Sequence, residues 1–178
     1  HLKRIAATQI YAQAQSNNHW ISEAAALFID GSWLGEKYYA ELGRKSLEQS
    51  VKCLIMKDGS FAQYSINYHR LVLETLIQVE IWRRWLSLPH FSTKYNECFK
   101  DLFNWLLNFV DPISGNAPNL GHNDGSNCYG LHNLDYRDFR PSLQLGYKLL
   151  TGNNLYPEGL WNEPLEWLGF EKKKSIKN

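Results

Sequence analysis

Residues 67–86 (NYHRLVLETLIQVEIWRRWL) carry the clearest structural signal in this sequence. Apolar side chains recur there every three or four residues, a spacing that places them on one face of an α-helix. Pro89 lies just past the end of the run, where a proline is expected after a helix stops. The pattern therefore predicts a helix over about 67–86, with its first turn formed by the polar residues Asn67, Tyr68, His69 and Arg70.

The same periodicity predicts helices on both sides of this stretch. Their expected ranges are about 3–15, 19–29, 34–57, 93–109 and 141–150, with a short helix near 163–168. Short turns rich in Asn, Gly, Asp and Pro join them, and no strand pattern competes with them. The predicted fold class is all-α, built of antiparallel helical hairpins as in a bundle, a solenoid or an α/α toroid.

Composition excludes several classes of protein. The chain has 178 residues, a formal net charge of +1, 44% hydrophobic residues and 21% charged residues. These values fit one domain with a sizeable core and give no basic surface for nucleic acid. No apolar run approaches the roughly 18 residues that would indicate a membrane span.

Cysteines and aromatic residues allow only open interpretations. Cys53, Cys98 and Cys128 are odd in number and widely spaced, so we expect free thiols rather than a disulfide framework or a zinc site. Aromatic residues reach 14%, with seven Trp. Large aromatic side chains fill cores, and they also form flat platforms on which sugars stack, so both uses stay open.

The first candidate group lies at the start of the predicted second helix. Asn18 and His19 would point hydrogen-bond donors outward at a helix N-terminus, where the helix dipole favours an anion such as a substrate carboxylate. Glu23 follows four residues after His19 and shares its face. The alternative is a plain helix cap formed by Asn17 or Asn18, with His19 half exposed.

The second candidate group is the first turn of the helix at 67–86. Tyr68 can act as a general acid or base if positive charge nearby lowers its pKa from about 10, and His69 or Arg70 would supply that charge. The alternative is an amphipathic helix with a solvated His-Arg pair.

The third group lies in residues 111–135, a long segment rich in Asn, Gly and Pro that we expect to be a structured, functional loop. Its stretch 118–125 contains Asp124, which we expect to form a structural ion pair with Arg137 or Arg140. No metal or cofactor is expected, since the sequence has no metal-binding motif. His19, Glu23 and His69 could form a three-ligand set only if their two helices brought these side chains together.

Four of these stretches, taken together and in order, resemble the heparinase II/III-like family of polysaccharide lyases, which includes heparin, heparan and alginate lyases. They are 18–25 (NHWISEAA), 58–63 (DGSFAQ), 67–74 (NYHRLVLE) and 118–125 (PNLGHNDG). The family fold is an α/α toroid followed by a β-sandwich domain. The resemblance implies a partial toroid over 1–170 and a tail over 171–178, without the β-sandwich.

The family cleaves uronic-acid polysaccharides by β-elimination. The resemblance assigns charge neutralisation to Asn18 with support from His19, and proton transfer to Tyr68, with Tyr64 as the alternative tyrosine. The side chains expected to bind substrate are His69, Arg70, Tyr64, Glu23, His122 and Asn123. The implied partners are an acidic polysaccharide or oligosaccharide and the family's β-sandwich domain, and the family favours a periplasmic or secreted bacterial protein.

Two other functions compete with the lyase. One is a carbohydrate-binding toroid without catalysis, which would keep the aromatic residues and the donors. The other is an α/α-toroid glycoside hydrolase using paired carboxylates, for which Glu23 and Asp124 would be the candidates.

Overall fold

The structure is a computed structural model that describes residues 1–127 and 130–171, and within them the regular structure is helical. This confirms the predicted all-α fold class. In chain order, the elements are α1 (Leu2–Gln15), α2 (Asn18–Trp33), α3 (Lys37–Leu54), α4 (Ile66–Trp85), α5 (Thr93–Leu107), α6 (Arg140–Thr151), the 3-10 turn η1 (Leu160–Asn162) and α7 (Glu163–Trp167).

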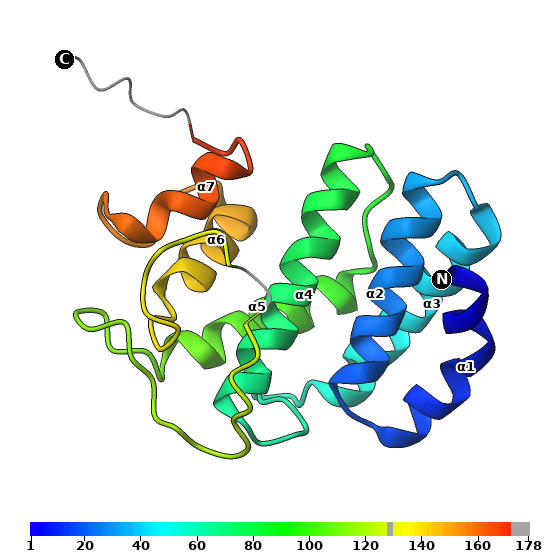
Figure 1. The fold of residues 1–178 in the computed structure, drawn as a ribbon, viewed down its shortest axis with the longest axis horizontal. Helices are drawn as coiled ribbons and strands as arrows, with labels where there is room; N and C mark the ends of the chain where they lie inside the picture. The colour runs from blue at the N-terminus through cyan, green and yellow to red at the C-terminus, as the bar shows by residue number, and fades with distance from the viewer. Residues whose placement is uncertain (128–129, 172–178) are drawn as a thin grey trace.

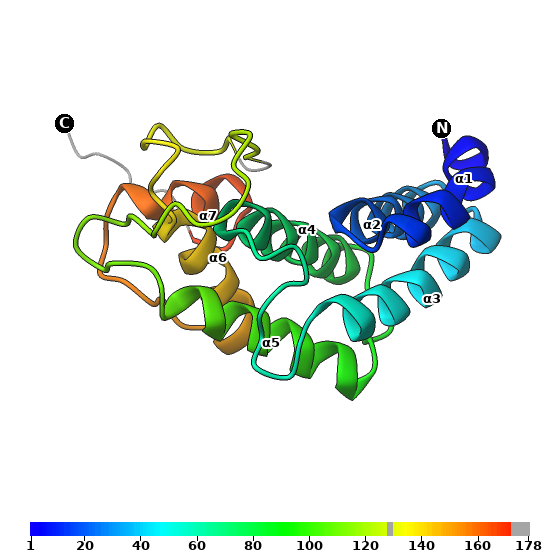
Figure 2. The same ribbon diagram turned by 90° about the horizontal axis from the view of Figure 1, so that it is seen from below.

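From α2 to α5, successive helices run antiparallel and alternate between two layers, so neighbours within one layer run in the same direction (Figures 1 and 2). α2 and α4 lie side by side in one layer, and α3 and α5 lie in the other. α1 packs against α2 at one end of the array, and α6 packs against α4 and α5 at the other. Across the described residues the array is open (Figure 2). The short connections between successive helices make these helices antiparallel hairpins.

Helix α4 is the centre of this arrangement, because it contacts α2, α5 and α6. Its buried positions run almost without a break from Ile66 to Glu74 and continue to Arg83, so they occupy every side of the helix. A helix that is buried all round cannot show a clean polar face. The apolar stripe seen in the sequence is therefore only part of what α4 buries, and several polar side chains of its first turns are enclosed as well.

The boundary between α2 and α3 differs from the sequence prediction. α2 does not stop at Gly31 but continues to Trp33, and α3 begins at Lys37 rather than at residue 34. Gly31 lies against the backbone of Ala40, and the turn falls at Gly35, which has a φ of 73°. Gly31 therefore allows α2 and α3 to approach each other closely, and it does not end α2.

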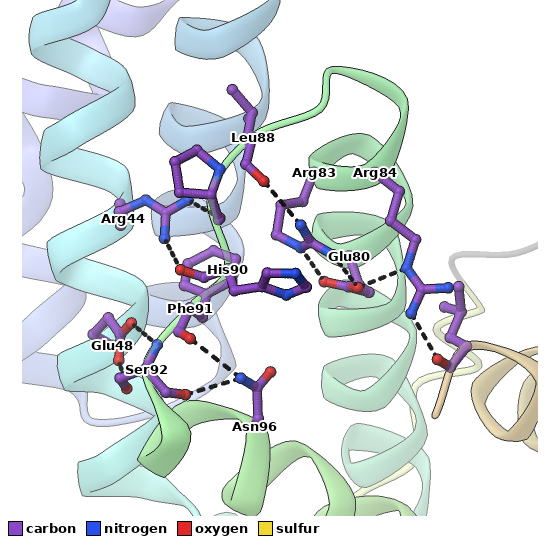
Figure 3. A network of polar contacts seen from close by, with 12 residues as sticks. Arg44, Glu48, Glu80, Arg83, Arg84, Leu88, His90, Phe91, Ser92 and Asn96 are labelled. Atoms are coloured by element: carbon purple, nitrogen blue, oxygen red, sulfur yellow. Dashed lines mark hydrogen bonds and ion pairs between the residues drawn. The ribbon is translucent and has the colours of Figure 1, made fainter. Parts of the chain in front are cut away.

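A polar network fastens the connection between α4 and α5 to α3 (Figure 3). The guanidinium of Arg44 donates hydrogen bonds to the backbone carbonyls of residues 89 and 90, at 2.8 and 3.1 Å. Glu48 accepts hydrogen bonds from the backbone N–H and the hydroxyl of Ser92, which caps the N-terminus of α5. These contacts fix where α5 begins.

The end of α4 is held by a second part of the same network (Figure 3). Glu80 accepts hydrogen bonds from both Arg83 and Arg84, at 2.6 to 2.7 Å. Arg83 also donates to the carbonyl of Leu88, and Arg84 donates to the carbonyl of Leu149 in α6. One carboxylate thus orders two arginines that tie α4 to the following loop and to α6.

The structure also bears on the predictions for the cysteines, the C-terminal tail and membrane-spanning helices. Cys53 is exposed and Cys98 is buried, and both are free thiols as predicted, while Cys128 lies outside the described residues. Residues 172–178 of the expected tail also lie outside them. No helix in the described part of the chain combines the length and apolarity that crossing a membrane requires.

Replacing Gly43 with alanine tests the close approach of α2 and α3. An added Cβ would lie 2.8 Å from the carbonyl oxygen of Ala24 and 2.8 Å from the carbonyl carbon of Leu27, both backbone atoms. We expect Gly43→Ala to lower the free energy of unfolding by roughly 1–3 kcal/mol, although alanine is the better helix former. Urea unfolding measures this.

Gly146→Ala is the matched control, because Gly146 is also inside a helix but its nearest neighbour is a side-chain atom of Phe103 at 3.1 Å. A ring can shift slightly, whereas the backbone of a packed helix cannot. Equal stability losses in the two variants would contradict the predicted α2–α3 contact.

Candidate functional site

The first turns of α2 and α4 lie at the same end of the molecule (Figure 1). Gln63, in the turn before α4, accepts a hydrogen bond from the backbone N–H of Asn18 at 3.0 Å. This contact joins the two helix N-termini through a side chain of the intervening segment. The two stretches that the sequence singled out, around Asn18 and Tyr68, therefore begin adjacent helices that pack against each other.

The start of α2 is capped by Asn17, whose side-chain oxygen accepts from the backbone N–H of His19 at 2.9 Å. Since Asn17 performs the capping, the side chain of Asn18 is not needed for it. Asn18 is half-buried and His19 is exposed. Glu23, one turn further on, is half-buried, and its Oε2 is enclosed with no hydrogen-bond partner among the described residues.

The loop 118–126 lies on the first turn of α4 and is held there by backbone contacts. The hydroxyl of Ser65 donates to the carbonyl of His122 at 2.5 Å, and the backbone N–H of Ile66 donates to the carbonyl of Leu120 at 3.1 Å. Ser65 is also the N-cap of α4, accepting from the N–H of Tyr68. The long segment that the sequence marked as a structured loop is thus part of the same site.

Asp124 is the loop residue that reaches Tyr68. The Tyr68 hydroxyl donates to Oδ2 of Asp124 at 2.9 Å. The backbone N–H and the hydroxyl of Ser126 donate to Oδ1 at 3.0 and 2.6 Å, and the Asn67 amide lies 3.4 Å from the same oxygen. The carboxylate therefore connects the loop to the first turn of α4, through the half-buried Tyr68 and the buried Asn67.

This arrangement corrects the expected ion pair of Asp124 with Arg137 or Arg140. Arg140 is paired with Asp138 at 2.6 Å, and Arg137 donates to the carbonyl of Ala117 at 2.5 Å. Both arginines bind other groups, so the carboxylate of Asp124 accepts hydrogen bonds from neutral donors instead.

The electrostatic expectation for Tyr68 was also wrong. The hydrogen bond to Asp124 raises the pKa of Tyr68, and the negative charge of Asp124 acts in the same direction. Conversely, the hydrogen bonds from Ser126 and then the one from Tyr68 lower the pKa of Asp124 to about 2. The pair is therefore a neutral phenol beside a carboxylate, the reverse of a phenol activated by positive charge.

His69 does not face the site, since it is only 1% exposed. Its Nε2–H donates to the carbonyl of Leu102 at 2.8 Å, and its ring stacks on Trp105 with centroids 4.5 Å apart. Burial lowers the pKa of His69 to about 4, so the imidazole is neutral at physiological pH. Its place between α4 and α5 does not fit the expected substrate contact, nor a shared ligand set with residues of α2.

Arg70 is likewise enclosed, with 1% exposure. It donates to the carbonyl of Tyr136 at 2.5 Å, to Oδ1 of Asn67 at 3.1 Å and to the carbonyl of Ser126 at 3.3 Å. Its guanidinium also lies over the ring of Phe139, 4.3 Å from the centroid. Arg70 therefore holds the loop against α4 from a buried position. This burial does not fit the expected contact with substrate.

His122 and Asn123 belong to the loop. His122 is exposed, while its carbonyl is used by the helix cap described above. Asn123 accepts from the hydroxyl of Tyr136 at 2.5 Å and donates to Asn119 at 2.7 Å. His122 is therefore an expected substrate-binding residue with an accessible side chain, whereas the hydrogen bonds of Asn123 shape the loop.

Tyr64, the alternative catalytic tyrosine, lies before α4 and is 77% exposed. Its φ of 51° places the residue in the left-handed region, which turns the chain into the helix. The ring lines a small apolar pocket of about 190 Å³, whose other walls are Ile66, Trp105, Phe109 and Leu120.

Several site residues gave little or no signal in the sequence. Ser65 is a serine just before a helix, a pattern typical of an N-cap. Asn67 and Gln63 lie in stretches that the sequence singled out, but their contacts with Asp124 and with the start of α2 are tertiary, so local sequence does not predict them. Ser126 bonds Asp124 two residues away, in a turn for which no role was predicted.

The comparisons add no relative to this picture. No family model, no curated protein and no solved structure matches the chain. Within residues 1–127 and 130–171, no group of three or more His, Cys, Asp or Glu side chains is arranged to hold a metal ion.

The buried His69 predicts a pH dependence of stability. Its pKa is about 4 in the folded protein and near 6.5 in the unfolded chain. The unfolded chain binds the proton more tightly. The free energy of unfolding therefore has its full value above about pH 6.5 and falls as the pH drops towards 4. The loss reaches roughly 3 kcal/mol. Urea unfolding at pH 7.5, 6, 5 and 4.5 measures it.

His69→Gln is the control for that series, because a glutamine amide can donate to the carbonyl of Leu102 but does not titrate. We expect this variant to be less stable at pH 7.5 but to lose less stability on acidification. Parallel curves for the two proteins would show that another group causes the effect.

A second variant pair tests how the loop is held. Gly121 has a φ of 74°, and an added Cβ would lie 2.7 Å from the Cα of Ser65. Gly125 has a similar φ of 78° with nothing within 4 Å. Both alanine variants carry the backbone strain of about 1–2 kcal/mol, but only Gly121→Ala also forces the loop off α4.

We therefore expect Gly121→Ala to lower the melting temperature clearly more than Gly125→Ala. Amide hydrogen exchange of residues 118–126 should rise in Gly121→Ala and change little in Gly125→Ala. If exchange is equal in the two variants, the docked loop does not depend on this close contact.

Proposed function

We propose that this chain carries one wall of the active site of a polysaccharide lyase, which cleaves uronic-acid-containing glycans by β-elimination. The observation that carries the proposal is the neighbourhood of two helix N-termini, one with Asn18 and His19 and the other with the hydrogen-bonded Tyr68 hydroxyl. The chain would then form part of an α/α toroid of the heparinase II/III-like type.

The first chemical requirement of such a reaction is neutralisation of the uronate carboxylate. The C5 proton is next to a carboxylate and is very weakly acidic until that charge is stabilised. The N-terminus of α2 suits this task, since the helix dipole favours an anion there. Its first backbone N–H groups are used by Gln63 and Asn17, so the hydrogen bond to the carboxylate would come from a side chain. With Asn17 as the cap, the amide of Asn18 is available to donate to the carboxylate.

The second requirement is proton transfer at C5 and at the glycosidic oxygen O4. In β-elimination the C5–H bond breaks, a C4–C5 double bond forms, and the C4–O4 bond breaks with a proton delivered to O4. The proposal gives Tyr68 the proton transfer, while His19, an exposed imidazole at the start of α2, supports Asn18. The substrate is an acidic polysaccharide, and the β-sandwich domain typical of the family would supply the opposite wall.

An assay of uronate polymers tests the proposal. Cleavage by elimination creates a conjugated unsaturated sugar, which is followed by its ultraviolet absorbance. We expect absorbance to grow with the wild-type chain. Tyr68→Phe should reduce the rate by about 10²–10⁴-fold, because proton transfer by a positioned side chain contributes that much. Asn18→Ala should reduce it by about 10²-fold or more through loss of charge stabilisation.

Tyr38→Phe is the matched control. Tyr38 is 70% exposed in the first turn of α3, at the opposite end of the α2–α3 hairpin, so its hydroxyl lies away from the site. New reducing ends without absorbance would indicate a hydrolase instead. Binding of the polymer without either product, weakened by Asn18→Ala, would indicate a carbohydrate-binding module.

A further inference from the structure

The carboxylate of Asp124 is divided between two tasks. Its Oδ1 receives the N–H and hydroxyl of Ser126, which closes a local turn, and its Oδ2 receives the hydroxyl of Tyr68 at 2.9 Å. Because the turn occupies one oxygen, the other is left in a fixed position. The phenol hydrogen therefore points at the loop in the described conformation, and a lone pair of its oxygen remains open.

Buried groups keep this carboxylate in place. Asn67 is 3% exposed and Arg70 is 1% exposed. Arg70 donates to Oδ1 of Asn67 on the helix and to the carbonyl of Ser126 on the loop. Asn67 and Ser126 both contact the carboxylate of Asp124, and one guanidinium therefore holds both of them. A rigid support of this kind is what a reacting side chain needs for a defined orientation.

We propose that Asp124 is a positioning residue for Tyr68, which fixes the phenol and keeps it protonated so that Tyr68 acts as a proton donor rather than as a base. This rests on the proposed lyase function. With substrate bound, the Tyr68 O–H would turn from Asp124 to O4, its proton would pass to O4 as the C4–O4 bond breaks, and solvent would then reprotonate the phenolate. A different group would accept the C5 proton, and the exposed imidazole of His19 is the candidate.

The chemistry is consistent with a phenol next to a carboxylate. A carboxylate disfavours the phenolate, so Tyr68 does not lose its proton before substrate binds. The oxygen of a departing sugar is far more basic than a phenolate, so donation to it stays favourable. Repulsion between the new phenolate and Asp124 then favours rapid reprotonation. A base, by contrast, would have to ionise against this charge.

Titration of Tyr68 tests the coupling without any need for turnover. Carbon-13 NMR of the tyrosine Cζ follows each phenol, and the signal lost in Tyr68→Phe identifies Tyr68. We expect its pKa to lie above the usual value in the wild type. In Asp124→Asn it should fall towards about 10, because the amide keeps a hydrogen-bond acceptor but carries no charge.

Ser126→Ala is the control for loop disturbance, since it removes the hydroxyl bond to Oδ1 but leaves the carboxylate. We expect the pKa of Tyr68 to stay raised in this variant. An unchanged pKa in Asp124→Asn would overturn the proposal, and so would an equal fall in both variants, because the effect would then come from loop movement.

The dependence of the lyase rate on pH tests the donor role. A proton donor must be protonated, so the rate should fall as the pH rises through the pKa of Tyr68. Asp124→Asn lowers that pKa and should therefore shift this decline to lower pH, with kcat affected more than KM. A rate that instead rises as Tyr68 ionises would make Tyr68 a base and overturn the donor role. Absence of elimination in the wild type would reject the proposed function, and the donor role with it, while the NMR titration still decides whether Asp124 controls Tyr68.

Discussion

The buried guanidinium of Arg70 is the interaction on which the geometry of the candidate site depends. It joins α4 to two separate parts of the long connection between α5 and α6, through the carbonyls of Ser126 and Tyr136, and it orders Asn67 on its own helix. Hydrogen bonds from a charged donor contribute about 1.5–3 kcal/mol each, and a buried charge without them would be prohibitive. The loop therefore has little freedom to leave α4 while Arg70 is enclosed.

That constraint separates the roles of three consecutive residues. Tyr68 points out towards Asp124, while His69 and Arg70 point into the core, where one stacks on Trp105 and the other holds the loop. Neighbours in the first turn of a helix face different directions, so closeness in sequence does not place their charges together. The phenol consequently meets a carboxylate and not a cation. This reverses its acid–base character, and with it the role of Tyr68 in the reaction that we propose.

Most of the fold was predictable from the sequence, because helical periodicity survives whatever the helices pack against. The ranges of α1, α4, α5 and α6 follow the predicted ones closely. The errors occur where tertiary contact overrides a local signal. Gly31 reads as a stop, yet it lets α2 and α3 approach, and the next residues extend the helix. For the candidate site, residue type singled out the first turns of α2 and α4 and the loop at 118–125, which lie close together in the structure, but it did not predict which side chains would be accessible.

The sequence by itself determined the all-α class, the order of the helices and the polar first turns at their N-termini, since these depend on spacing and capping within a few residues. Only the tertiary structure decided that Asp124 meets Tyr68 rather than an arginine, that His69 is neutral and enclosed, and that Arg70 is structural. Those outcomes depend on desolvation and on partners 33 to 66 positions away in the chain. Local sequence carries no information about such distances, so the chemical character of the site is a property of the fold.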